Sequence, residues 1–408
     1  MKTPASSLPR VWWIYWGGNF ISQIGTWMQS TAQAWLVLDL TGSPTMLGVL
    51  LAFQHLPAVL LALPAAGLAD RYGRRNTLLC TQIALAALAV VVAALIARGT
   101  LSFPLLLGAA FLSGVANAVS QPARIALAAT LAGPGGYSRT AGLATLSFNL
   151  ARIVGPCLGG LAMAGLGVAA AFAANAASFL PLLAVLAWRL TDVAAANRPR
   201  ARAAIRDAAG FLWRNDQTRM PLLAVAAAGV LAINVQALVP AYARFALGLD
   251  AAGLGWLMGA IGAGACLGGF LQWRWPAGSA ARTFAAAAGL GLCLLGLAAP
   301  PHMASSLALL AAFGLCSATA LSSTAAAVQM AVPDHLRTAA SALQILIVLG
   351  SNPIGGLLTG WAVDRLGPAE GAGSLGAATL FAIALLWLLR SCQWPRAMPQ
   401  MLDVTKKI

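Results

Sequence analysis

Long apolar stretches, each bounded by charged residues or by Gly and Pro turns, follow one another along the whole chain. Most approach or exceed the roughly 20 residues that an α-helix needs to cross a bilayer. They lack the alternating polarity of membrane β-strands. The pattern therefore predicts an all-α integral membrane protein with twelve transmembrane helices, over residues 11–38, 44–69, 76–98, 102–123, 139–164, 167–188, 219–246, 251–273, 281–299, 304–331, 337–363 and 371–390.

Composition supports this prediction, because 60% of the residues are hydrophobic and only 9% are charged, with a mean hydropathy of +0.81. So few charges cannot cover the surface of a water-soluble protein of 408 residues. The protein is expected to lie in lipid, and a bacterial inner membrane is the expected location. The net charge of +15 alone is also typical of proteins that bind nucleic acid, but the arginines are dispersed over loops, as insertion and anionic lipids require.

The basic residues also predict the orientation. If the N-terminus is cytoplasmic, all but four of the 25 Lys and Arg residues fall in cytoplasmic segments, the exceptions being Arg98, Arg152, Arg244 and Arg365. The positive-inside rule then places both termini in the cytoplasm.

A basic polar segment divides the chain into two sets of six spans. We expect an N-terminal bundle over residues 1–189, a cytoplasmic linker with an amphipathic helix over 190–218, and a C-terminal bundle over 219–408. An internal repeat favours this division, since Arg139-Thr140-Ala141 recurs 198 residues later as Arg337-Thr338-Ala339. Two pseudo-symmetric six-helix bundles place a substrate site between them, near mid-membrane. A chance match is the alternative.

Polar residues recur on one side of several predicted helices. In the first span the spacings are 4, 3, 4 and 3, and the fourth span shows a similar stripe. Such stripes face water or a substrate, or else they form hydrogen bonds between helices. We expect a substrate path lined by Asn19, Gln23, Thr26, Ser30, Gln33, Asn117 and Gln121, with Asn234 and Gln236 from the second half.

Arg152 lies in the middle of the fifth span, directly before Gly155-Pro156. A charge at the bilayer centre costs about 2.5 to 3.5 kcal/mol on insertion scales, so a chain that keeps one there is expected to use it. Arg152 therefore either pairs with an anionic group of the cargo or holds the fifth span to its neighbours.

The loop after the second span combines an acid with several arginines. It contains Asp70, Arg71, Gly73, Arg74 and Arg75. A buried acid at a helix end needs a partner, for which Arg124 is a candidate. The loop is either a gate or conformational latch, or it only sets the topology.

This loop resembles the motif between the second and third helices of the major facilitator superfamily, although Ala66 stands at the motif's leading glycine. The fifth span resembles the motif of that superfamily's antiporters at Gly142, Gly155, Pro156, Gly159 and Gly160, with Ala151 in place of one Gly. Further segments are similar to the enterobactin-exporter-like branch, namely Gln121-Pro122-Ala123-Arg124, Ser147–Pro156, Asn175–Leu180 and Val332–Arg337.

The resemblance implies proton-driven export of a siderophore or drug-like molecule by alternating access, with no cofactor and a monomeric protein. One feature departs from this expectation, because none of the ten acids lies at the middle of a span. We therefore expect His55 or Asp39 to take the coupling proton, although a structural role for His55 is equally compatible.

Other functions fit the sequence less well. A membrane-embedded enzyme would need a catalytic dyad or a metal site in the spans, and none is visible; the six cysteines are too dispersed for zinc or a disulfide framework. No Gly-rich nucleotide loop is present. Proton-coupled import of a small metabolite and non-concentrating translocation of lipid or solute remain the alternatives. The expected partners are a small-molecule substrate, protons and membrane lipids.

Overall fold

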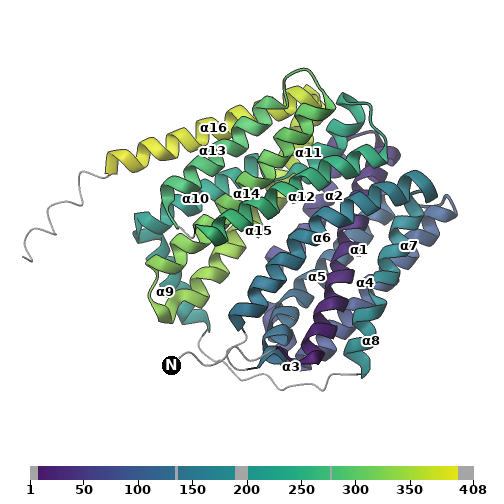
Figure 1. Ribbon diagram of the computed structural model, residues 1–408, viewed down its shortest axis with the longest axis horizontal. Helices are drawn as coiled ribbons and strands as arrows, with labels where there is room; N and C mark the ends of the chain where they lie inside the picture. Colours follow the sequence, from purple (N-terminus) through teal and green to yellow (C-terminus); the bar gives the residue numbers. More distant parts are fainter. Residues whose placement is uncertain (1–7, 134–136, 189–200, 276–277, 394–408) are drawn as a thin grey trace, which may run out of the picture.

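The computed structural model describes residues 8–133, 137–188, 201–275 and 278–393, and this part of the chain is helical, with no strand (Figure 1). The first half contains α1 (Arg10–Thr41), α2 (Pro44–Leu60), α3 (Ala62–Tyr72), α4 (Arg74–Ala97), α5 (Phe103–Ala132), α6 (Tyr137–Leu166), α7 (Val168–Ser178) and α8 (Leu180–Trp188).

The second half begins with α9 (Ala201–Arg214). It continues with α10 (Asp216–Leu231), α11 (Val235–Ala241), the π-helical turn η1 (Tyr242–Ala246), α12 (Ala251–Arg274), α13 (Ala280–Gly296), α14 (Met303–Ala331), the 3-10 turn η2 (Asp334–Leu336), α15 (Arg337–Leu366) and α16 (Pro368–Gln393). In Figure 1 the purple and blue helices of the first half stand beside the green and yellow helices of the second.

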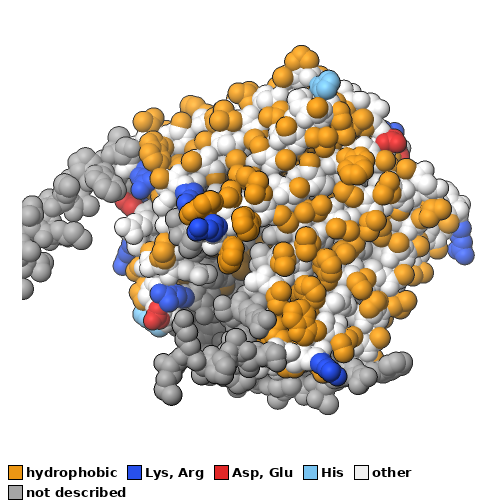
Figure 2. Space-filling model, in the orientation of Figure 1, with side chains coloured by type: hydrophobic (Ala, Val, Ile, Leu, Met, Phe, Trp, Pro, Cys, Tyr) orange, Lys and Arg blue, Asp and Glu red, His pale blue; other side chains and the backbone are white. Residues whose placement is uncertain are grey.

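Within the described residues, nine helical segments are long and apolar enough to cross a membrane, and α2 and α13 are shorter apolar helices. Large apolar side chains point outward, including Leu166 with 80% exposure and Phe381 with 73%. Figure 2 shows a broad hydrophobic surface across the middle of one face, with most of its visible basic side chains near the end where α9 lies. This is the surface that lipid tails require.

Two helices, one in each half, match in length. Both α6 and α15 have 30 residues, and each contains a single interior proline, Pro156 or Pro353. Each is joined to the next helix by one glycine with positive φ: Gly167 at +82° and Gly367 at +92°. A side chain would be strained in this conformation, which explains the glycine at both corners.

The seventh apolar stretch is interrupted between α10 and α11. The amide of Asn234 donates to the carbonyl of Gly229 at 2.6 Å, so a side chain satisfies one of the carbonyls that the broken helix leaves free. The break turns α11 toward α1 and α2 of the first half, which it contacts.

The helix α9 belongs to the second half by its contacts. Its buried Ala208 and Leu212 pack in a cluster with Leu222, Val328 and Leu336. The sequence pattern had predicted an amphipathic helix in this segment, and the structure has a helix there.

Candidate functional site: a cavity between the two halves

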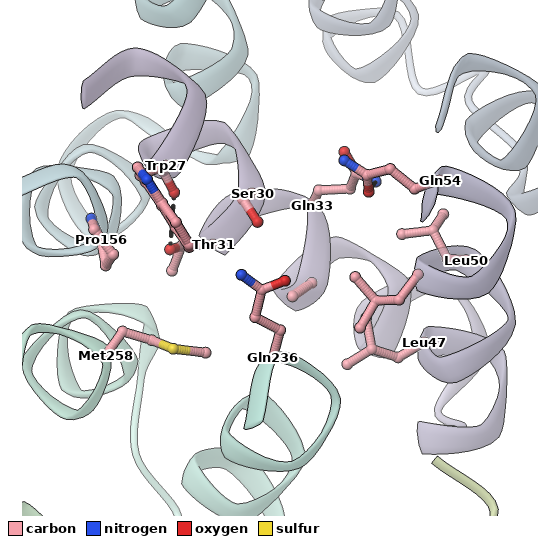
Figure 3. A pocket seen from close by; sticks show the side chains of 12 residues that line it. Trp27, Ser30, Thr31, Gln33, Leu47, Leu50, Gln54, Pro156, Gln236 and Met258 are labelled. Atoms are coloured by element: carbon pink, nitrogen blue, oxygen red, sulfur yellow. Dashed lines mark hydrogen bonds between the residues drawn. The ribbon is translucent and has the colours of Figure 1, made fainter. Parts of the chain in front are cut away.

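A cavity lies where α1, α2 and α6 of the first half meet α11 and α12 of the second (Figure 3). It consists of two adjoining pockets. Four residues line both pockets, namely Trp27, Pro156, Gln236 and Met258. We call the two pockets together the central cavity.

The first half supplies most of the polar wall. Ser30, Thr31 and Gln33 come from one turn of α1, and Gln54 comes from α2. The amide of Gln33 donates to the side-chain oxygen of Gln54 at 3.2 Å, which ties α1 to α2. The Thr31 hydroxyl donates to the Trp27 carbonyl at 3.1 Å. Amides and hydroxyls in such a wall can bind a polar solute.

The second half supplies a mostly apolar wall. Met258 and Ile261 come from α12, and Val235 comes from α11. The exception is Gln236, whose amide points into the cavity toward Ser30 and Gln33 in Figure 3. Apolar residues of α1 and α2 also line the cavity.

Arg152 lines the smaller pocket and carries the only charge among the residues that line the central cavity. Its guanidinium carbon lies 5.6 Å from the centroid of the Trp27 ring, within cation–π range. Trp27 is itself flanked edge-to-face by Phe148, with ring centroids 5.6 Å apart. No ion pair of Arg152 is found within the described residues.

The glycines of the α6 motif fix that helix between two neighbours. A Cβ added to Gly155 would lie 2.7 Å from the carbonyl oxygen of Ile24 on α1, and one added to Gly159 would lie 2.9 Å from that of Met28. On the other side, a Cβ on Gly160 would lie 2.6 Å from the carbonyl oxygen of Ala251, at the start of α12. Gly142 has no neighbour within 4 Å of such an added atom.

We call the α6–α12 contact the first seam. Beyond Gly160 it continues along α12, where Cβ atoms added to Gly255 and Gly262 would lie 2.8 Å from the Pro156 carbonyl and 2.9 Å from the Arg152 carbonyl. The α2–α15 contact is the second seam. There, Cβ atoms added to Gly48 and Gly360 would lie 2.5 Å from the carbonyls of Gly356 and Pro44.

Side chains add to these contacts at the end where α1 turns into α2. Asp39 on α1 forms an ion pair with Arg244 in η1, across the two halves. Ser43 and Thr45 donate to the same carboxylate oxygen of Asp364 on α15, at 2.9 and 2.6 Å. We call Asp39, Ser43, Thr45, Arg244 and Asp364 the polar cluster, and this end of the molecule the closed end.

The structure places several predicted path residues away from the central cavity. Asn19 is buried and Gln23 is half-buried, but neither lines it. The exposed Thr26 bonds the Ser22 carbonyl at 2.8 Å, while the Asn117 amide bonds that of Ser113 at 2.9 Å. Gln121 is exposed, and Asn234 caps the broken helix. Ser30, Gln33, Arg152 and Gln236 are the predicted residues that the cavity brings together.

The predicted latch loop lies at the other end of the molecule. The side chain of Asp70 is outside the described residues. Arg71 is exposed, and its guanidinium carbon lies 5.5 Å from the centroid of the Tyr72 ring. Gly73 adopts a φ of +84°, Arg74 donates to the Thr130 hydroxyl at 2.9 Å, and Arg75 donates to the Leu186 carbonyl at 2.6 Å.

Arg124 and His55 also lie outside the cavity lining. The Nε atom of Arg124 is buried without a hydrogen-bond partner in the described residues. His55 is half-buried in α2, next to the cavity residue Gln54.

Sequence reasoning missed Trp27, Thr31, Gln54 and Met258 as cavity residues. A signal existed for Gln54, because it is a polar residue within an apolar span. Trp and Met are common residues in such spans, so only the packing of α1 against α12 identifies Trp27 and Met258 as cavity residues.

The family model described as transmembrane secretion effector matches residues 5–401. The multidrug efflux pump Tap of Mycolicibacterium fortuitum is 26% identical over 356 residues, which cover 84% of this chain and 87% of that protein.

Two solved structures show a shared fold. A bacterial homologue of the human lysosomal transporter Spinster, in an inward-facing and unoccupied conformation, has a TM-score of 0.74 at 14% identity, over 95% of this chain and 97% of the other. A mutant of the peptide transporter POT gives 0.75 at 13% identity, over 95% of both chains.

Proposed function

We propose that this chain, which belongs to the transmembrane secretion effector family of major facilitator transporters, exports small amphiphilic molecules by alternating access. The observation that carries the proposal is the central cavity, which both halves line and in which amides, hydroxyls and a guanidinium lie beside apolar side chains. A solute with a polar and an apolar part that binds there contacts both halves at once, so its binding is sensitive to their relative movement. Similarity to the efflux pump Tap supports the outward direction.

The fold supports a twelve-span arrangement. Three groups of elements each count as one span: α2 with α3, α7 with α8, and α10 with α11 and η1. Together with nine other helices, and without α9, they give twelve spans in two sets of six. Arginines at the start of α4 and the end of α12 lie at the end opposite the polar cluster, which favours cytoplasmic termini in a bacterial inner membrane.

In this orientation the closed end faces away from the cytoplasm. The two seams and the polar cluster hold the halves together on that side, which corresponds to a state that loads from the cytoplasm. Export then requires both seams to separate and the opposite ends of the helices to approach.

Proton exchange, if it drives this cycle, falls to His55 or Asp39. Asp39 already pairs with Arg244, so protonation of its carboxylate would weaken the contact between the halves. Vesicles that carry the His55→Gln or the Asp39→Asn variant test each residue under an imposed pH gradient. The residue whose variant keeps wild-type coupling has no part in proton exchange.

Efflux from cells that lack their own drug pumps tests the export function. Cells that express the chain should retain less of at least one amphiphilic drug or dye than cells with an inactive variant, and should do so against a gradient. Gly160→Leu at the first seam is suited as the inactive variant, and Gly165→Leu on the same helix is its control, because an added Cβ there meets nothing within 4 Å. Greater accumulation in expressing cells would instead indicate import.

A further inference from the structure

We propose that the cargo of the central cavity is an amphiphilic organic anion, bound by Arg152 through its acidic group, and that its charge lets the membrane potential drive its export. The proposal rests on the export function above and names its substrate class. It starts from the lone guanidinium in the cavity wall.

No counter-ion for Arg152 is available on the helices that meet there. The sequence has no Asp or Glu between Asp70 and Asp192, nor between Asp250 and Asp334, so α6 and α12 both lack one. The acids of the closed end are already engaged, Asp39 by Arg244 and Asp364 by two hydroxyls. A half-buried charge without a counter-ion is costly within a membrane, and an anionic ligand reduces that cost.

Arg152 is not needed to hold α6 in place by its side chain. Backbone contacts already fix this helix, through Gly155 and Gly159 against α1 and through Gly160 against α12. At Arg152 itself, the carbonyl oxygen faces Gly262 of α12, whereas the side chain lines the cavity. The helix therefore uses the backbone at this position for packing and leaves the guanidinium for a ligand.

The surroundings of Arg152 select the rest of the ligand. The Trp27 ring flanks the guanidinium, and Val235, Met258 and Ile261 line the same pocket. An aromatic or aliphatic body fits against Trp27 and Met258, while a carboxylate or other acidic group reaches the guanidinium. A cationic solute would meet an unpaired positive charge in the same place.

The charge of such a cargo has an energetic consequence. A monovalent anion that leaves a cell with a negative interior moves down the membrane potential, by about 2.3 kcal/mol per 100 mV. That energy corresponds to an accumulation of about 50-fold per 100 mV. Export of this class of solute therefore needs no proton-binding carboxylate in the spans.

Three probes with one naphthyl body test the substrate class: 1-naphthoate, 1-naphthamide and 1-naphthylmethylammonium, with charges of −1, 0 and +1. Binding to the purified full-length protein in detergent is measured by calorimetry. We expect naphthoate to bind at least about tenfold more tightly than naphthamide, in line with a charge-assisted hydrogen bond. Equal binding of the two, stronger binding of the cation, or no binding of naphthoate overturns the proposal.

Two variants assign the effect to Arg152. Arg152→Gln should lose about tenfold in naphthoate affinity and keep its naphthamide affinity, while Arg152→Lys should keep part of the preference. Arg98→Gln removes one exposed positive charge at the end of α4 and should change neither. If Arg152→Gln weakens both probes equally, or lowers the melting temperature as much as it lowers binding, the residue is structural and the proposal fails.

Transport in proteoliposomes tests the driving force. A potassium diffusion potential, positive inside the vesicle, should drive naphthoate uptake, whereas a pH gradient without a potential should leave uptake near the protein-free level. Uptake that follows only the pH gradient overturns the proposed driving force. If naphthoate fails but a neutral or cationic drug is still pumped, the export function stands and the anion assignment falls; if no solute is concentrated, both fall.

Discussion

The two seams that join the halves are built differently. The first, between α6 and α12, consists of backbone contacts at Gly160, Gly255 and Gly262, supported by one weak hydrogen bond from the Cys157 thiol to the Gly255 carbonyl at 3.6 Å. The second, between α2 and α15, has similar glycine contacts but also the hydroxyl-to-carboxylate bonds of Asp364 at its end.

Because of this difference, we expect the two kinds of contact to respond differently to substitution. Where backbones touch, any added side chain must push the helices apart, so the contact is either present or lost. Side-chain hydrogen bonds and ion pairs near water can be weakened in small steps. We therefore expect the first seam to respond sharply to substitution and the polar cluster to respond gradually.

The largest effect is expected for Gly160→Leu in the first seam. Its Cβ would lie 2.6 Å from the Ala251 carbonyl, and overpacking of this kind costs about 1 to 3 kcal/mol or more. The closed state should become about 5 to 150-fold less populated, with a matching loss of transport.

Thiol labelling measures that population. A chain whose six native cysteines are replaced by Ala and that carries Ser30→Cys exposes the cavity to an impermeant reagent only when the closed end opens. Labelling from outside should rise in Gly160→Leu and stay at the wild-type level in Gly165→Leu. Unchanged labelling in Gly160→Leu would show that the seam does not hold the closed end.

Gly48→Leu makes the same test at the second seam. The added Cβ would lie 2.5 Å from the Gly356 carbonyl, so we again expect a loss of transport of about tenfold or more. Gly108→Leu, where an added Cβ meets no atom within 4 Å, is the control. Wild-type transport by Gly48→Leu would mean that only the first seam must close.

A smaller effect is expected when the ion pair of the polar cluster is broken. The side chains of Asp39 and Arg244 are 39% and 32% exposed, and such pairs contribute about 0 to 1 kcal/mol. Asp39→Asn should raise outside labelling of Ser30→Cys by no more than about fivefold. The double variant Asp39→Arg with Arg244→Asp should restore the wild-type level. If neither Asp39→Asn nor the double variant changes the labelling, the ion pair has no part in gating.

The smallest effect is expected for Asp364→Asn. An amide oxygen still accepts from Ser43 or Thr45, but without the charge, and neutral hydrogen bonds are roughly half as strong as charge-assisted ones. Outside labelling should rise by about twofold to threefold. An effect as large as that of Gly160→Leu would contradict the distinction between the backbone contacts and the polar cluster.

The sequence predicted the helical class and the apolar spans because both follow from local patterns of hydrophobicity. It also marked Arg152 and Gln236 as unusual polar residues, and both line the cavity. It could not separate Ser30 from Thr26 on the same stripe. A stripe shows which face avoids lipid, but only the crossing of α1 with α11 and α12 decides which part of that face meets a cavity.

For the same reason, contacts between residues far apart in the chain could not be predicted from the sequence. Gln29, which lies off the stripe, accepts from the Asn175 amide at 2.6 Å and so uses its polarity to bind α1 to α7. Asp39 and Arg244 are 205 residues apart, and no local spacing links them. The basic segment and the internal repeat gave the expectation of two halves, whereas the identity of their contacts required the structure.

The single glycines Gly167 and Gly367 have a mechanical consequence. Because each corner has one residue, neither α6 nor α15 can shift without carrying its neighbour, α7 or α16, along with it. When a seam separates, α7 or α16 is therefore expected to move with its neighbour through the surrounding lipid. We therefore expect the transport rate to depend on bilayer thickness and lateral pressure as well as on the cargo.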